Sequence, residues 1–268
     1  MDCPALASVR AKIDRSIHHF GQVESIIDAA LFKHDAEGGL AVNYDSEGKK
    51  FSIEHPKRDP LDPSLPLIIG DCIHNLRSAL DHLVLQLARL NPLTAAAAET
   101  MTAFPVYLNP KQFNNFVRDH VRPFISSTAL AQIENLQPYA TGNHGDKDIL
   151  WVLSQLDVID KHRLLIVVEQ STTMESHSIT SNFPVRISEN DFGKWKPMVG
   201  GTKLMTIDVS AGAKGPGKMK MEISSANRIC LADTGMDCDD FPVQMVLSNS
   251  ILFVQSIVAT FGIKFFGE

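Results

Sequence analysis

One segment, residues 67–90 (LIIGDCIHNLRSALDHLVLQLARL), constrains the fold of this chain more than any other. Its apolar side chains recur at alternating spacings of four and three residues, which gathers them on one side of an α-helix with 3.6 residues per turn. They are Ile69, Ile73, Leu76, Leu80, Leu83 and Leu87. Because so continuous an apolar side must be buried, the segment predicts a long helix packed against other parts of the chain.

The other side of this helix is a polar stripe that contains no Glu and no Lys, the usual residues of a solvated helix surface. At about 100° per residue, the stripe covers a little under half of the circumference. Its members are Asp71, His74, Asn75, Arg77, Ser78, Asp81 and His82. Such residues carry out chemistry, bind ions or satisfy one another in a buried hydrogen-bond network. The sequence leaves a functional site and a structural network as open alternatives.

Length and composition limit the class of protein. A chain of 268 residues with 44% hydrophobic and 21% charged residues is typical of a folded protein with one large or two small domains. The net charge of −6 gives no general attraction for nucleic acid, so an RNA contact needs a local basic surface. Candidates for such a surface include Lys111, Arg118 and Arg122.

Cysteine spacing and hydropathy bear on the compartment. No CxxC pair occurs among Cys3, Cys72, Cys230 and Cys238, which argues against a zinc ribbon or a disulfide framework. The N-terminal segment lacks the apolar core of a signal peptide, and no unbroken apolar run reaches the length of a membrane span. We therefore expect a cytoplasmic protein without a membrane contact.

The remaining patterns predict an α+β fold: a helical bundle with a small antiparallel β-sheet and a C-terminal helix. Helical spacing marks residues 5–31, 110–121, 127–136 and 149–165, and a C-terminal helix with apolar residues from Val243 to Phe261. Alternating patterns predict a β-hairpin near 39–54 and an antiparallel sheet over 164–232. We divide the chain into a bundle, residues 1–165, which includes helix 67–90 and the hairpin, and a β-rich segment with the C-terminal helix, residues 166–268. We expect the two parts to pack as one unit.

The polar stripe contains an arginine followed, after four intervening residues, by a histidine. RNA cleavage without a metal needs a group that titrates near neutral pH and a fixed cation that stabilises charge on the phosphate. His82 and Arg77 have these properties, and Asp81 lies four residues from Arg77, where it can orient the guanidinium.

This Arg77-x4-His82 pattern resembles the arginine–histidine motif of HEPN domains, which are helical bundles that include metal-independent ribonucleases and inactive binding relatives. The resemblance implies an RNA substrate, no cofactor, a homodimer, and catalytic roles for Arg77 and His82. The inactive relatives imply an alternative, a non-catalytic module that senses a ligand or binds a protein partner.

A broader resemblance covers roughly residues 5–168. The blocks GDCIHNLRSALDHL, FPVY, LQPY and LDVIDKHRLL are similar to a set of uncharacterised bacterial proteins of comparable length. This resemblance implies that the blocks belong together, but it implies no activity.

A second candidate site combines helix 67–90 with the LDVIDKHR segment. If the two helices pack together, Asp160 or His162 meets His74, Asp81 or His82, and Lys161 adds positive charge. Imidazoles and carboxylates bind divalent transition metals, so a metal-dependent hydrolase or oxygenase that uses His74, His82 and Asp160 is a further alternative. Neither HxxxH nor ExxH occurs in these segments. The polar end of the second helix also suits a structural partnership with helix 67–90.

The sequence thus yields a ranked set of site residues. The candidates for catalysis are Arg77, His82, Asp81 and His74, and the candidates for support are Asp71, Asn75, Ser78, Asp160, Lys161 and His162.

Overall fold

The computed structural model describes residues 3–36, 40–47, 49–54, 60–93, 95–98, 103–142, 147–163, 167–181, 183–191, 203–209, 219–232, 234–236 and 241–268. The chain divides into two compact units, which are described separately below. The helical unit comprises Met1–Glu24, Ser64–Val167 and Leu231–Glu268, and the β unit comprises Ser25–Pro63 and Val168–Cys230. Helix α1 (Ala7–Ala36) crosses the boundary between them.

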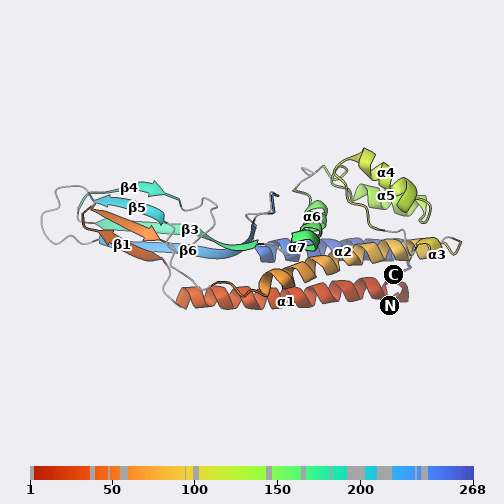
Figure 1. Cartoon of the computed structure of the whole chain (residues 1–268), viewed down its shortest axis with the longest axis horizontal. Helices are drawn as coiled ribbons and strands as arrows, with labels where there is room; N and C mark the ends of the chain where they lie inside the picture. The colour runs from red at the N-terminus through yellow and green to blue at the C-terminus, as the bar shows by residue number, and fades with distance from the viewer. Residues whose placement is uncertain are drawn as a thin grey trace. The chain divides into compact units, whose positions relative to one another are not determined.

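The helical unit contains the first part of α1 and the other helices of the described chain (Figure 1). These are a short 3-10 helix η1 (Pro4–Leu6), α2 (Leu65–Arg89), α3 (Ala95–Ala98), α4 (Pro110–His120), α5 (Ser127–Asn135), α6 (Ile149–Arg163) and α7 (Val243–Phe265). Helices α6 and α7 both pack on α2, and α7 also packs on α6. The predicted mixed α+β fold with a packed C-terminal helix is confirmed.

Helix α2 forms where the sequence predicts it and begins two residues earlier. Pro66 lies in its first turn, where the missing N–H breaks no hydrogen bond. The apolar residues Ile69, Ile73, Leu76, Leu80 and Leu83 are fully buried, so the predicted apolar side is the core of this unit. The buried Ser16 of α1 donates its hydroxyl to the carbonyl of Cys72 at 3.0 Å, which fastens α1 to α2.

Helix α7 is the one helix among the described residues that is long and apolar enough to cross a membrane. Half of its most apolar window is buried within the structure, and the buried residues of the helix include Val243, Leu247, Val254 and Phe261. Core helices share this composition, because both surroundings require apolar side chains.

The β unit has one sheet of four antiparallel strands in the order β1 (Ala41–Asp45), β2 (Lys50–Glu54), β5 (Lys203–Val209) and β4 (Val185–Asn190). Strands β3 (Val167–Ser181) and β6 (Met219–Ala232) form a second sheet. The predicted hairpin is present as β1 and β2. The sequence patterns did not predict that β2 pairs with β5, a strand about 150 residues further along the chain.

The core of the β unit is a small apolar cluster of Ile53, Met205 and Ile207. Ile179 of β3 and Met221 of β6 pack against it.

Candidate functional site on helices α2 and α6

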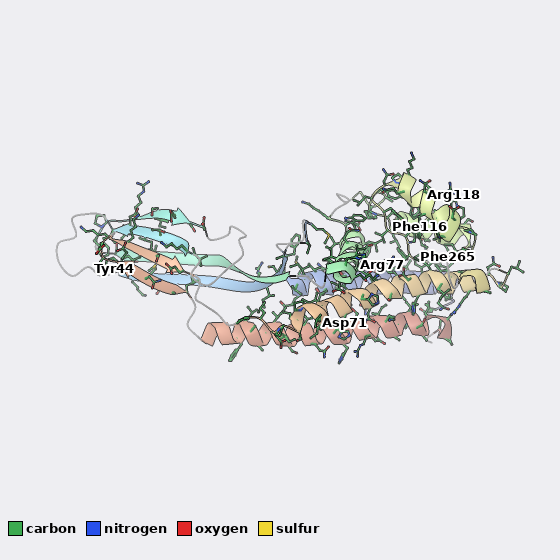
Figure 2. The ribbon with its side chains drawn as sticks, viewed as in Figure 1. Tyr44, Asp71, Arg77, Phe116, Arg118 and Phe265 are labelled. Carbon is green, nitrogen blue, oxygen red and sulfur yellow. The ribbon has the colours of Figure 1, made fainter. Side chains whose placement is uncertain are left out.

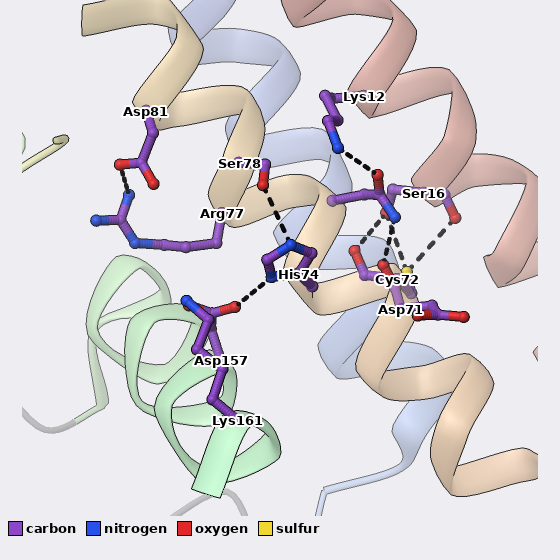
Figure 3. Close-up of polar contacts among 11 residues, drawn as sticks. Lys12, Ser16, Asp71, Cys72, His74, Arg77, Ser78, Asp81, Asp157 and Lys161 are labelled. Atoms are coloured by element: carbon purple, nitrogen blue, oxygen red, sulfur yellow. Dashed lines mark hydrogen bonds and ion pairs between the residues drawn. The ribbon is translucent and has the colours of Figure 1, made fainter. Parts of the chain in front are cut away.

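His74 of α2 and Asp157 of α6 form the central contact of the candidate site (Figure 3). Nδ1 of His74 lies 3.1 Å from Oδ1 of Asp157. The Asp157 side chain is 4% exposed and the His74 side chain 48% exposed, so a buried carboxylate holds an accessible imidazole. When Nδ1–H donates to this carboxylate, Nε2 of His74 is the nitrogen that accepts a proton.

Two further side chains extend the contact in both directions. The Lys161 ammonium, one helical turn after Asp157, donates to Asp157 Oδ2 at 2.6 Å. Ser78, one turn after His74, has its hydroxyl oxygen 3.5 Å from Nε2 of His74. The result is a linear network of Lys161, Asp157, His74 and Ser78, hereafter the histidine relay. Both terminal pairs are four residues apart, which is the spacing of neighbours on a helix surface.

Asp160 approaches α2 at Gly70. A Cβ atom on Gly70 would lie 2.2 Å from Oδ1 of Asp160, so only glycine leaves room for this carboxylate at its present position. Burial raises the pKa of Asp160 above its ordinary value, and the charges of Asp157 and Asp71 raise it further. His74 and Lys161 oppose this shift. Helix α6 thus packs on α2, but Asp157, rather than the predicted Asp160 or His162, makes the direct contact with His74.

Arg77 and Asp81 are directed towards the chain segment 103–107. Arg77 Nη1 donates to Asp81 Oδ1 at 2.8 Å, and Arg77 Nη2 donates to the carbonyl of Phe104 at 2.6 Å. The amide N–H of Phe104 completes the ring by donating to Asp81 Oδ1 at 2.8 Å. The Arg77 side chain is 13% exposed, so its guanidinium is engaged with a backbone segment rather than presented to solvent. We call this ring of hydrogen bonds the Phe104 clamp.

Gln137 holds the same segment from the other end. This fully buried residue accepts from the Tyr107 N–H at 3.1 Å and donates to the Pro105 carbonyl at 2.9 Å. The segment 103–107 has no regular secondary structure, so its backbone groups need such partners. The blocks FPVY and LQPY thus contact each other. The sequence pattern marks the LQPY block, but it does not indicate the role of Gln137.

The other predicted residues are distributed around these networks. Asn75 donates to the carbonyl of Asp71 at 2.7 Å and accepts from Lys12 at 3.4 Å, which keeps it on the α1 side of α2. His82 is half-buried and makes no hydrogen bond within the described part of the chain. His162 is exposed on α6.

The predicted alternative of a metal site depends on His74, His82 and Asp160 meeting. Within the described ranges, no group of three or more His, Cys, Asp or Glu side chains is arranged to hold a metal ion. His74 is instead occupied by Asp157.

Comparisons with known proteins add no family to this description. No protein-family model, no curated protein and no solved structure matches the chain. Both resemblances described above therefore stay predictions, and the chemistry of the site has to be argued from its own residues.

Proposed function

We propose that this protein is a HEPN-like, metal-independent ribonuclease in which His74 of the histidine relay moves the proton. The observation that supports this proposal best is the contact between the half-exposed imidazole of His74 and the buried carboxylate of Asp157. A carboxylate on Nδ1 fixes the tautomer and the orientation of the imidazole, which leaves Nε2 to exchange a proton with a substrate.

The proposed reaction is an internal transesterification. Nε2 of His74 accepts the proton of a ribose 2′-hydroxyl while the 2′-oxygen forms a bond to phosphorus. The bond between phosphorus and the 5′-oxygen breaks, and the 5′-oxygen takes a proton from water. The hydroxide that remains takes the proton from Nε2 of His74, which restores the neutral imidazole. The products are a 2′,3′-cyclic phosphate and a 5′-hydroxyl. The Ser78 hydroxyl lies 3.5 Å from Nε2, and in this proposal the 2′-hydroxyl of the substrate takes its place.

The cation that stabilises charge on the phosphate is, in this proposal, Lys161. Its ammonium donates one hydrogen bond to Asp157, and its half-exposed side chain leaves further N–H groups for a phosphate oxygen. The Arg77 guanidinium is only 13% exposed and is used by the Phe104 clamp. Arg77 is accordingly a positioning residue, which acts through the segment 103–107. His82 remains a candidate for a second proton-transfer group, because its imidazole is free of hydrogen bonds within the described residues.

A cleavage assay with end-labelled RNA tests the proposal. We expect His74→Ala and Asp157→Asn to lower the cleavage rate by about 100-fold or more, the usual contribution of general acid–base catalysis. His162→Ala is the matched control, since it removes an exposed imidazole from the same helix as Asp157 and should leave the rate unchanged. Cleavage should continue in a chelator, and His82→Ala measures the share of the second histidine.

The assay also separates the proposal from other chemistries. Cleavage that survives His74→Ala at the rate of the original protein would refute the role of the relay. Loss of cleavage in chelator alone would favour a metal-dependent enzyme. Circular dichroism of each variant shows whether a lost rate reflects lost folding.

A second candidate function is a non-catalytic interaction module, and one observation favours it. Arg77, the arginine of the Arg-x4-His pattern, and Asp81, which orients it, are both engaged in holding Phe104. Under this candidate, α2 is a scaffold that positions neighbouring segments for a ligand or a partner. Purified protein that cleaves no RNA, and whose binding to a partner is unaffected by His74→Ala, would support it.

A further inference from the structure

Three aromatic rings form a row beside the Phe104 clamp. The Phe116 ring of α4 stacks on the ring of His120 with centroids 4.7 Å apart and planes inclined by 30°. Phe116 also contacts the Tyr107 ring, with centroids 5.7 Å apart. All three side chains are partly exposed rather than buried, so each presents some ring surface to solvent. Partly exposed aromatic rings in a row are typical of surfaces on which planar ligands stack.

Several cations lie in the same stretch of the chain as Phe116 and His120. Lys111, Arg118 and Arg122 lie in or directly after α4, and all three are exposed. The only carboxylate between residues 110 and 122 is Asp119, in a chain whose net charge is −6. This short region is therefore locally positive. Figure 2 shows Phe116 and Arg118 on the same helix.

Arg118 is partly neutralised by its neighbour. Its Nε and Nη2 atoms donate to the two carboxylate oxygens of Asp119 at 3.0 and 3.1 Å. Lys111 and Arg122, by contrast, make no ion pair within the described part of the chain. A polyanion that carries planar rings would match this combination, because rings and cations are both available to it.

The row of rings is held rigidly and connects to the candidate site. The buried Gln137 fixes the backbone of Tyr107. A ligand that binds the Tyr107 ring therefore loses no binding free energy to ordering this segment. Tyr107 follows Phe104 by three residues, and the Phe104 carbonyl accepts from Arg77, so the ring belongs to the segment that the Phe104 clamp holds. Arg77 follows His74 by three residues on α2.

We propose that Tyr107, Phe116 and His120, together with Lys111, Arg118 and Arg122, form a binding surface for single-stranded RNA. Bases stack on the rings and phosphates contact the cations, as in other binders of single strands. This inference rests on the proposed function for the choice of RNA, and it adds the form of the substrate. A duplex hides the faces of its bases, so the surface discriminates against double-stranded RNA.

Fluorescence anisotropy with a labelled, 2′-O-methylated RNA decamer tests this surface without cleavage, because the 2′-hydroxyl is blocked. We expect Phe116→Leu to weaken binding about tenfold, within the range measured for stacked aromatic residues. Arg122→Gln should weaken binding and reduce the slope of log K against log salt by about 0.7, the value for one phosphate contact of a single strand. Arg15→Gln, which removes an exposed cation of α1, is the control for charge.

A gain-of-binding variant makes the test stricter. Asp119→Asn removes a negative charge and releases Arg118, so it should tighten binding of the decamer. Asp14→Asn changes the net charge equally on an exposed part of α1 and should have a smaller effect. Equal effects of the two substitutions would overturn the surface, as would unchanged affinity in Phe116→Leu or equal affinity for duplex RNA.

The two proposals fail differently. If the protein binds the decamer through these residues but cleaves no RNA, the ribonuclease proposal fails and the binding surface stands. If it cleaves RNA and Phe116→Leu leaves both affinity and KM unchanged, the binding surface fails and the ribonuclease proposal stands.

Discussion

The Phe104 clamp makes Asp81 the residue of the polar stripe whose loss should cost the most stability. One carboxylate oxygen of Asp81 accepts both from Arg77 and from the amide of Phe104, each at 2.8 Å. Asp81→Ala removes both hydrogen bonds at once. It also leaves the Arg77 guanidinium, whose side chain is only 13% exposed, without its carboxylate partner.

The magnitude follows from these contacts. A hydrogen bond to a charged group contributes about 1.5–3 kcal/mol, and breaking a buried ion pair on one side costs about 3–5 kcal/mol. Because the Asp81 side chain is 37% exposed, water screens part of this interaction, and we expect a loss of about 3 kcal/mol. Asp81→Asn keeps an oxygen acceptor and should cost roughly half as much.

Urea unfolding followed by tryptophan fluorescence measures this loss in the helical unit. Trp151 lies on α6, and Trp195 lies outside the described residues, so a Trp195→Phe background makes the signal specific for the helical unit. Asp14→Ala is the control, because Asp14 is exposed on α1 and its substitution should change stability by about 0.5 kcal/mol or less.

Two results would refute the reasoning. One is an Asp81→Ala variant that is no less stable than Asp14→Ala. The other comes from a double variant, Arg77→Leu with Asp81→Leu, which removes both charges. If the double variant loses as much free energy of unfolding as the single variants Arg77→Leu and Asp81→Leu together, the pair is not coupled and the clamp does not act as one unit.

Three further predictions concern the surroundings of the relay. Gly70→Ala should destabilise the original protein more than it destabilises an Asp160→Ala variant, in which the added methyl group has room. Gly21 lies in open space on α1, so Gly21→Ala should stabilise the protein by about 0.5–1 kcal/mol. Equal effects of Gly70→Ala in the two backgrounds would contradict the close approach of Asp160. Because the pKa of Asp160 is raised in the folded state, the unfolded chain binds fewer protons and stability falls as pH rises through that pKa; Asp160→Asn should therefore stabilise at neutral pH, with a gain that shrinks as pH falls, and a pH-independent gain would exclude this cause. Burial raises the pKa of the Cys72 thiol to about 11, so iodoacetamide at pH 8 should modify Cys72 only after unfolding, and rapid modification of the folded protein would show that this thiol is accessible.

The helices were predictable because each has a local pattern of apolar residues at helical spacing. The apolar residues of α2 recur with helical spacing, and several of those on its buried side are among the large, fully buried side chains of the core. The hairpin of β1 and β2 was predictable for the same reason, since a turn separates two short alternating runs. The pairing of β2 with β5 was not, because strands that alternate in the same way accept any partner with a matching face.

The candidate site shows where local patterns stop being informative. A helical wheel puts His74, Ser78, Arg77 and Asp81 on one side of α2, and that part of the prediction is correct. The pattern does not say that His74 meets Asp157 while Arg77 meets the carbonyl of Phe104, because those partners lie 83 and 27 residues further along the chain. Because of these contacts, His74 keeps an ionisable imidazole exposed to solvent. Arg77 and Asp81 instead hold the backbone of Phe104 and contribute to the stability of the fold.

Gly70 is a second case in which the sequence alone does not reveal a residue's role. In the sequence it reads as a weak point in a helix, since glycine loses more backbone entropy than alanine on folding. In the structure its missing side chain admits the carboxylate of Asp160, which lies near the charges of Asp157 and Asp71. Under the proposed function, the three carboxylates repel phosphates and Lys161 offsets only part of this repulsion, so RNA needs a separate region of positive charge to bind. The cations of α4 supply such a region, so a ribonuclease built on this chain has to bind RNA with one group of residues and transfer its proton with another.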